Sequence, residues 1–214
     1  MEKYSLLRAR VTGFAAVDLD VPEAATSKQL RRVHSEPYVD GVLAGSLSKR
    51  EVRRIGFPWS PELVERSLRS VGGTIAAGRS ALKDGTAANL AGGTHHAFPG
   101  HGEGFCVFND VAVAIRALEA DGVAHRFSVL DLDVHQGNGT ATIFEDDNAV
   151  FTLSVTKPGM AERDRLVFDL CERAGAPVAV VMAGGYAHTI ADTVDIHEAT
   201  IRGAAARMRA HVDA

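Results

Sequence analysis

Cysteine is scarce in this 214-residue chain, which contains only Cys106 and Cys171. Two cysteines do not make a disulfide framework, so we expect a protein of the reducing cytoplasm. Long apolar runs are missing as well. No stretch has the roughly 20 apolar residues that cross a bilayer, and the first residues lack the charged-then-apolar pattern of a secretory signal. The sequence therefore predicts no membrane partner.

A strong charge of one sign is also lacking. The formal net charge is −4 and the isoelectric point is ≈ 6.1. The short basic cluster at 49–54, KREVRR, is typical of a solvated face rather than of a stripe that follows a phosphate backbone. We therefore expect no nucleic-acid partner.

The composition fits one domain over residues 1–214, because 46% hydrophobic residues are enough to build a core and no repeat, linker or low-complexity tract is present. Short apolar strands alternate with longer helical patterns. This order predicts an α/β fold, a doubly wound and mostly parallel sheet with flanking helices. The expected strands are 87–90, 127–130, 149–155 and 178–183, and the expected helices are 60–83, 111–120, 160–173 and 196–212.

The stretch 131–139, DLDVHQGNG, follows the apolar strand 127–130 directly. Ligands and metals gather at the carboxyl ends of strands in open α/β sheets. Residues two apart on an extended chain lie ~7 Å apart and can share an ion. Asp133 and His135 are therefore the natural zinc-ligand pair. Asp131 lies deeper in the strand and is better placed to orient another group.

A second cluster, AGGTHHAF at 91–98, brings two adjacent histidines after another apolar run. On a regular strand His95 and His96 would point to opposite faces, so both serve one site only from an irregular loop. Histidines in such a loop can bind a metal or act as general acid and base. A surface His-His is the alternative for the dipeptide alone.

A third segment, GEGFCVFND at 102–110, leads into a helix that Asn109 can cap. Its glycines do not match the dinucleotide-binding pattern, so nucleotide binding is excluded. Phe105 is a candidate wall of an apolar substrate channel. Further on, the strand from Val178 ends in a glycine turn and Tyr186, whose hydroxyl can donate a hydrogen bond to developing negative charge.

Together these motifs resemble the histone deacetylase superfamily, the arginase-like hydrolases that include bacterial acetylpolyamine amidohydrolases. The resemblance covers nearly the whole chain. It implies a zinc-dependent hydrolase that removes acetyl or other acyl groups from acetyl-lysine, acetylpolyamine or related amides, with an acetylated small molecule or peptide as substrate.

The resemblance also implies roles for particular residues. Asp133 and His135 would bind zinc. His96 would be the general base, with Asn138 as its partner, and His95 would pair with Asp131 as an electrostatic or acid catalyst.

Three further positions complete the roles that the resemblance implies. Tyr186 would polarise the acetyl carbonyl, and Gly104 and Phe105 would line the tunnel for the acylated amine. A structural potassium ion would use Asp131 and Ser154.

The sequence departs from this family in one consequential way. Family members supply a third zinc ligand, an Asp, from a segment before the Gly-Gly-Tyr strand, and no such motif lies between Val155 and Val178. We therefore expect an internal deletion near 155/156. The first residues, Met1 to Tyr4, resemble an internal segment of the family, so we also expect a truncated N-terminus and the loss of some family strands. Two ligands would hold zinc weakly, because a catalytic zinc normally has three protein ligands.

Three hypotheses stay open, two of them within the resemblance. The chain is either an active deacetylase or a shortened, catalytically impaired homologue that acts, if at all, as a binding protein. An arginase-like binuclear manganese hydrolase is the weakest hypothesis, because that branch needs additional bridging Asp and His ligands. The sequence does not define the oligomeric state, although unpaired strand edges would favour self-association.

Overall fold

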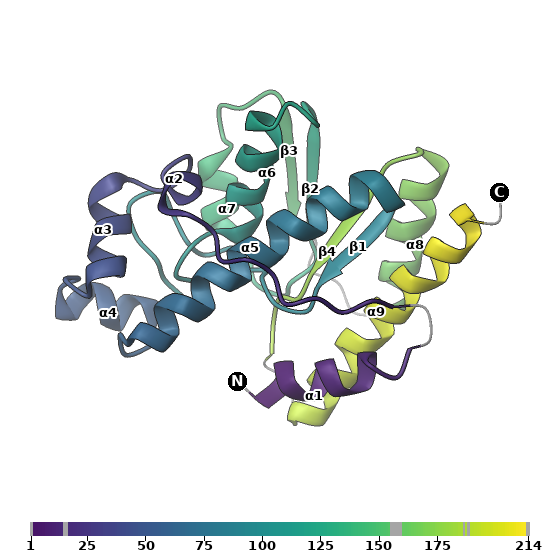
Figure 1. The fold of residues 1–214 in the computed structure, drawn as a ribbon, viewed down its shortest axis with the longest axis horizontal. Helices are drawn as coiled ribbons and strands as arrows, with labels where there is room; N and C mark the ends of the chain where they lie inside the picture. The colour runs from purple at the N-terminus through teal and green to yellow at the C-terminus, as the bar shows by residue number, and fades with distance from the viewer. Residues whose placement is uncertain (1, 15–16, 155–159, 186, 188, 213–214) are drawn as a thin grey trace. The chain divides into compact units, whose positions relative to one another are not determined.

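A computed structural model describes residues 2–14, 17–154, 160–185, 187 and 189–212. The chain divides into two compact units, each described by itself: Met1–Val21, Ala76–Ala91 and Lys157–Ala214 form the first, and Pro22–Ile75 and Gly92–Thr156 the second. Each unit contains one pair of parallel strands with helices beside it (Figure 1), which confirms the α/β class. The prediction of one domain over the whole chain stays a prediction.

The first unit pairs β1 (Thr86–Asn89) with β4 (Val178–Val181), and Ala88 lies opposite Val180. Its helices are α1 (Glu2–Val11), α8 (Met160–Arg173) and α9 (Ile190–Val212), and α1 and α8 both pack against α9 (Figure 1). The core of this unit consists of Leu7, Val11, Met182, Val194 and Ile201.

The apolar pattern predicted that the last helix begins at residue 196, but α9 begins earlier, at Ile190. Thr189 and Asp192 explain the earlier start. The Thr189 N–H donates to Asp192 Oδ2 at 3.0 Å, and the Asp192 N–H donates to Thr189 Oγ1 at 3.1 Å. This reciprocal capping satisfies free N–H groups of the first turn. The turn that it adds also buries Val194, at 0% exposure.

The second unit contains the strands β2 (Phe127–Asp131) and β3 (Val150–Ser154), paired in parallel with Asp131 opposite Ser154. Its helices are α2 (Ser27–Leu30), α3 (Glu36–Ala44), α4 (Lys49–Ile55), the first part of α5 (Pro61–Asp84), α6 (Asp110–Ala120) and α7 (Asn138–Ile143). The largest core cluster gathers residues of α2 to α6, with Leu30, Val39 and Val113 fully buried. A second cluster places Phe127 and Val150 against Ile115 and Phe144.

The structure confirms several helix boundaries that were predicted from local sequence signals. The Leu63 N–H donates to Ser60 Oγ at 3.2 Å at the start of α5, and Gly85 ends that helix with φ 81°. Asn109 caps α6, because its Oδ1 accepts the Ala112 N–H at 3.0 Å. Side-chain caps of this kind depend only on residues three positions apart, so the sequence reveals them.

The composition-based expectations also have structural counterparts. The basic side chains of α4 (Lys49, Arg50, Arg53 and Arg54) are exposed, as expected of a solvated face. Both cysteines are free. Among the described residues, no helix combines the length and apolar character that a membrane span requires.

His34, which the sequence analysis did not single out, is a buried structural imidazole at 2% exposure. Its Nδ1 lies 2.9 Å from the Phe98 carbonyl oxygen, and its Nε2 accepts the Asn109 N–H at 3.0 Å. Burial lowers its pKa to about 4, although hydrogen bonds to backbone act in the opposite direction. The neutral ring therefore joins the chain before α3 to the loop that precedes α6.

Acidification should destabilise the protein through His34. Between the unfolded pKa near 6.5 and the folded pKa of about 4, the unfolded chain binds the extra proton, so the free energy of unfolding falls as the pH falls through this window. The full loss is about 3 kcal/mol. Urea unfolding at several pH values between 7.5 and 4 measures it.

His34→Ala is the matched variant. It should be less stable at pH 7.5 by about 2–3 kcal/mol, because Asn109 N–H and the Phe98 carbonyl lose a buried partner, and its pH dependence should be shallower than that of the parent. Equal slopes for the two proteins would contradict the assignment to His34.

Candidate active site

The loop that carries His95 and His96 is held by the carboxylate of Asp110, the first residue of α6. Asp110 is 0% exposed. Its oxygens accept hydrogen bonds from Thr74 Oγ1 at 2.6 Å, the Gly93 N–H at 3.2 Å, and the Thr94 N–H at 2.8 Å. A buried carboxylate needs such donors, and the amino end of α6 adds favourable electrostatics. The loop is thereby fixed against α5 and α6.

His95 faces the carboxylate that the sequence analysis paired with it. Nδ1 of His95 lies 2.6 Å from Asp131 Oδ2, and both side chains are nearly buried. The carboxylate only accepts, so Nδ1 donates and Nε2 is left facing the site. Burial opposes the charge of the ring, but the hydrogen bond and negative charge of Asp131 outweigh it and raise the pKa of His95.

His96 faces Asn138, the first residue of α7. Nδ1 of His96 lies 2.7 Å from Asn138 Oδ1. The rings of His95 and His96 are 4.1 Å apart between centroids, although the two residues are adjacent in the chain. Both imidazoles therefore belong to one site, and each has its Nδ1 occupied by a side chain of the second unit.

Two glycines give the imidazoles room. A Cβ on Gly104 would lie 2.8 Å from His96 Cδ2, and the backbone there has φ 57°. A Cβ on Gly137 would overlap Asp131 Oδ2. Gly104 and Gly137 are thus required by their close approach to the His96 ring and to the carboxylate that binds His95.

Asp133 and His135 also lie together, as the spacing predicted. Asp133 Oδ1 is 2.9 Å from His135 Nδ1 and accepts the His135 N–H at 2.8 Å. The Asp133 side chain is 4% exposed, whereas that of His135 is 49% exposed. Carboxylate oxygen and imidazole nitrogen are suitable zinc donors. However, the described part of the chain contains no group of three or more His, Cys, Asp or Glu residues that could hold a metal.

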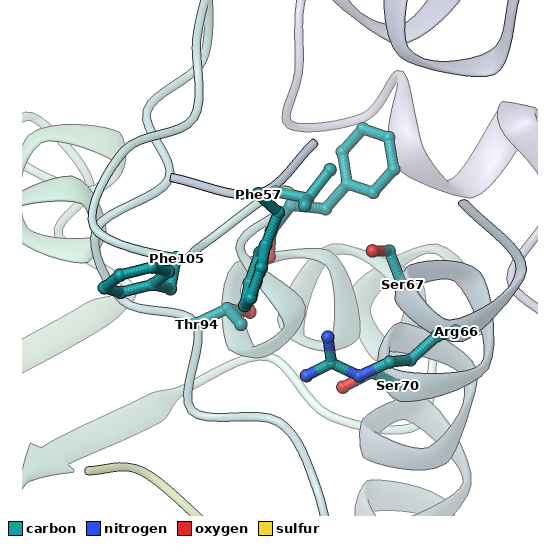
Figure 2. A pocket seen from close by; sticks show the side chains of 8 residues that line it. Phe57, Arg66, Ser67, Ser70, Thr94 and Phe105 are labelled. Atoms are coloured by element: carbon teal, nitrogen blue, oxygen red, sulfur yellow. Dashed lines mark hydrogen bonds between the residues drawn. The ribbon is translucent and has the colours of Figure 1, made fainter. Parts of the chain in front are cut away.

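Phe105 projects beside the histidine loop with an unusual backbone conformation, φ 63°. Its ring is 47% exposed and contacts Phe57 with centroids 5.1 Å apart. Figure 2 shows Phe57 and Phe105 lining a small cavity together with Arg66 and Thr94. With a volume of ≈ 20 Å³ the cavity holds about one water molecule.

Cys106 lies close to the histidine loop but is no candidate nucleophile. Burial raises the pKa of its thiol to about 12, so the thiolate is scarce at neutral pH. The chemistry available here is proton transfer and electrostatic stabilisation by two oriented imidazoles, not covalent catalysis by cysteine.

Some of the remaining predicted site residues lie in the described part of the chain and others do not. Gly104 lies against the His96 ring, and Phe105 contacts Phe57. Ser154 lies opposite Asp131 in the β2–β3 register. Tyr186 and the junction at 155/156 lie outside the described residues. The roles of all these residues stay predictions.

Sequence reasoning missed two residues that the structure places at the site. Asp110 was visible only as the last letter of the GEGFCVFND segment, and Glu103 only as a residue between two glycines. Glu103 Oε1 accepts from Asn138 Nδ2 at 3.4 Å. Asp110 is 36 positions from Thr74, and Glu103 is 35 positions from Asn138. No local sequence pattern could therefore have identified these contacts.

The chain is similar to known proteins both in sequence and in structure. The family model described as the histone deacetylase domain matches residues 2–157. An uncharacterised protein of Picosynechococcus is 36% identical over 250 residues, covering 86% of this chain and 83% of the relative. Acetoin utilization protein AcuC of Bacillus subtilis is 34% identical, covering 73% of this chain and 42% of that protein.

Solved structures are similar as well. A histone deacetylase homologue from Aquifex aeolicus has a TM-score of 0.62 and 28% identity, covering 72% of this chain and 44% of that chain. The same values hold for an HDAC homologue complexed with SAHA. The chain thus spans less than half the length of these two structures and of the Bacillus relative.

Asp110→Asn should destabilise the second unit. An amide can accept on one atom only, so its NH2 group would face donors of the histidine loop. We expect a loss of about 2–4 kcal/mol in the free energy of unfolding, measured by urea denaturation. Asp146→Asn is the matched control, because Asp146 is exposed. Equal stability of the two variants would show that the Asp110 network is not essential.

Proposed function

The chain belongs to the histone deacetylase family, and on this premise we propose that it is a hydrolase that removes an acetyl group from an acylated amine. The observation that carries the proposal is the pair of imidazoles whose Nδ1 atoms face Asp131 and Asn138 at 2.6 and 2.7 Å. The family assignment rests on a domain match over residues 2–157. Acetyl-lysine and acetylpolyamine are the proposed substrate classes.

The residues of the second unit suit the proton transfers of amide hydrolysis. With Nδ1 of His96 donating to Asn138, the Nε2 lone pair can accept a proton from an attacking water. His95, whose pKa Asp131 raises against the effect of burial, can supply positive charge or a proton to the departing amine. Tyr186 is proposed to hydrogen-bond the oxyanion.

Zinc is the proposed cofactor, and the described residues meet its needs only in part. Asp133 and His135, two positions apart, provide one oxygen and one nitrogen donor that lie close together. A catalytic zinc takes three protein ligands, and no third is found among the described residues. A potassium site at Asp131 and Ser154 also stays a proposal, supported by their register.

An internal deletion near 155/156 would account for the missing ligand. The family match ends at residue 157, next to this junction. The alignment with the Picosynechococcus relative is 250 residues long, longer than this chain, so it contains positions that have no counterpart here. Both observations support the proposal that a family segment is absent after β3.

Acetate release tests the proposed function. The purified chain, supplied with zinc, should release acetate from an acetyl-lysine peptide or an acetylpolyamine. His96→Ala should lower the rate by about 10²–10⁴-fold, because the general base is lost.

His125→Ala is the control, since His125 is exposed in the α6–β2 connection, and it should keep the parent's rate. If the folded chain released acetate from neither substrate class, the proposed deacetylase activity would be refuted. The alternative, an inactive homologue that acts as a binding protein, would then remain.

Zinc binding should be weak. After gel filtration, we expect less than one zinc per chain by elemental analysis, and less still for Asp133→Ala, because two protein ligands leave the ion largely exposed to exchange. Asp146→Ala serves as the control for nonspecific carboxylate binding. One zinc retained per chain would instead demand a third ligand.

A further inference from the structure

We propose that Glu103 is a positioning residue that decides, through Asn138, which ring nitrogen of His96 carries the proton. The carboxylate of Glu103 lies on the loop before α6, and its Oε1 accepts from Asn138 Nδ2 at 3.4 Å. The catalytic meaning of this contact rests on the proposed function, but the contact and its effect on the ring do not.

The two neutral forms of an imidazole differ in chemistry. With the proton on Nδ1, the lone pair is on Nε2, and with the proton on Nε2 the ring has no basic atom there. An amide opposite Nδ1 selects between them, because its oxygen accepts and its NH2 donates. The orientation of the Asn138 amide therefore sets the form of His96, whose Nδ1 lies 2.7 Å away.

An asparagine amide can turn over with little change in shape, so something must hold it. Two neighbours do so from opposite sides. The Gly139 N–H donates to Asn138 Oδ1 at 2.9 Å, and an N–H group cannot accept. Glu103 accepts from Nδ2, and a carboxylate cannot donate. In the reversed amide both contacts would be repulsive.

Glu103 is itself fixed. Arg54 Nε, from α4, donates to Glu103 Oε2 at 3.1 Å. The Cys106 N–H donates to the Glu103 carbonyl oxygen at 2.9 Å and closes the tight turn through Gly104 and Phe105. His101 Nε2 is 3.6 Å from Glu103 Oε2 and is the one buried side-chain nitrogen or oxygen without a hydrogen-bond partner among the described residues.

These contacts form one continuous connection from α4 to the base. Arg54 binds Glu103, Glu103 binds the NH2 group of Asn138, and the oxygen of Asn138 faces Nδ1 of His96. Among the described residues, only the Gly139 N–H remains to orient the amide if Glu103 is removed. We therefore expect the population ratio of the Nδ1–H form of His96 to the Nε2–H form to fall about tenfold. This is the effect of losing one hydrogen bond to a charged group.

Glu103→Met removes the acceptor and keeps the length of the side chain. Two-bond ¹H–¹⁵N correlation spectra of the full chain, labelled at histidine nitrogen, give the ratio of the two forms at a pH where the ring is neutral. The His96 signals are assigned by their loss in His96→Gln. The parent should be almost entirely Nδ1–H, and Glu103→Met should show a mixture.

A rescue variant separates orientation from general damage. Asn138→Asp offers only acceptors, so it fixes Nδ1–H without help from Glu103. The double variant of Glu103→Met with Asn138→Asp should regain the parent's ratio. Glu65→Met, which removes an exposed ion pair with Arg69 on α5, is the matched control and should leave the ratio unchanged.

The outcomes are decisive in either direction. A folded Glu103→Met chain with the parent's ratio overturns the proposal, as does a double variant that stays mixed. If the Met variant does not fold, Glu103→Ala takes its place with the same expectations. The spectra need no substrate. A parent chain that releases no acetate would therefore refute the proposed function, whereas the effect of Glu103 on the His96 ring would still be tested by the spectra.

Discussion

A buried carboxylate must be surrounded by donors, and the candidate site depends on how Asp110 satisfies that requirement. The donors come from α5 and from the backbone of the histidine loop, so one side chain joins a helix to a loop with no regular structure of its own. The donors on the loop side are Gly93 and Thr94, the residues directly before the histidine pair. The imidazoles are positioned because the buried Asp110 carboxylate binds the two residues that precede them.

Hydrogen-bond partners also determine where the two histidines of the loop carry their protons. Each Nδ1 faces an oxygen acceptor, Asp131 in one case and Asn138 in the other. The carboxylate attracts a proton to His95, whereas the amide gives His96 an orientation without a full charge. Two adjacent residues of the same type thereby acquire different roles, and Glu103 joins the second of them to the surface helix α4.

Much of the fold and of the site could be predicted from the sequence. The strand before Asp131, the Asn109 cap of α6 and the end of α5 at Gly85 all follow from apolar runs and local capping. Helix α9 began earlier than its apolar pattern predicted, because the polar pair Thr189 and Asp192 caps it and the added turn places Val194 in the core. The pairing of β1 with β4 could not be predicted, since it joins strands about ninety residues apart.

The sequence by itself determined the family, the α/β class and the kinds of side chain at the site, because these depend on residue type and on spacing within single segments. Only the tertiary structure decided which nitrogen meets which oxygen. The resemblance implied that His96 pairs with Asn138, 42 positions away, but the atoms in contact, Nδ1 and Oδ1, follow from the packing of the loop against α7. The contacts of Glu103, His34 and Asp110 are equally non-local. Hydrogen-bond direction depends on where groups lie in space, and no linear pattern specifies that.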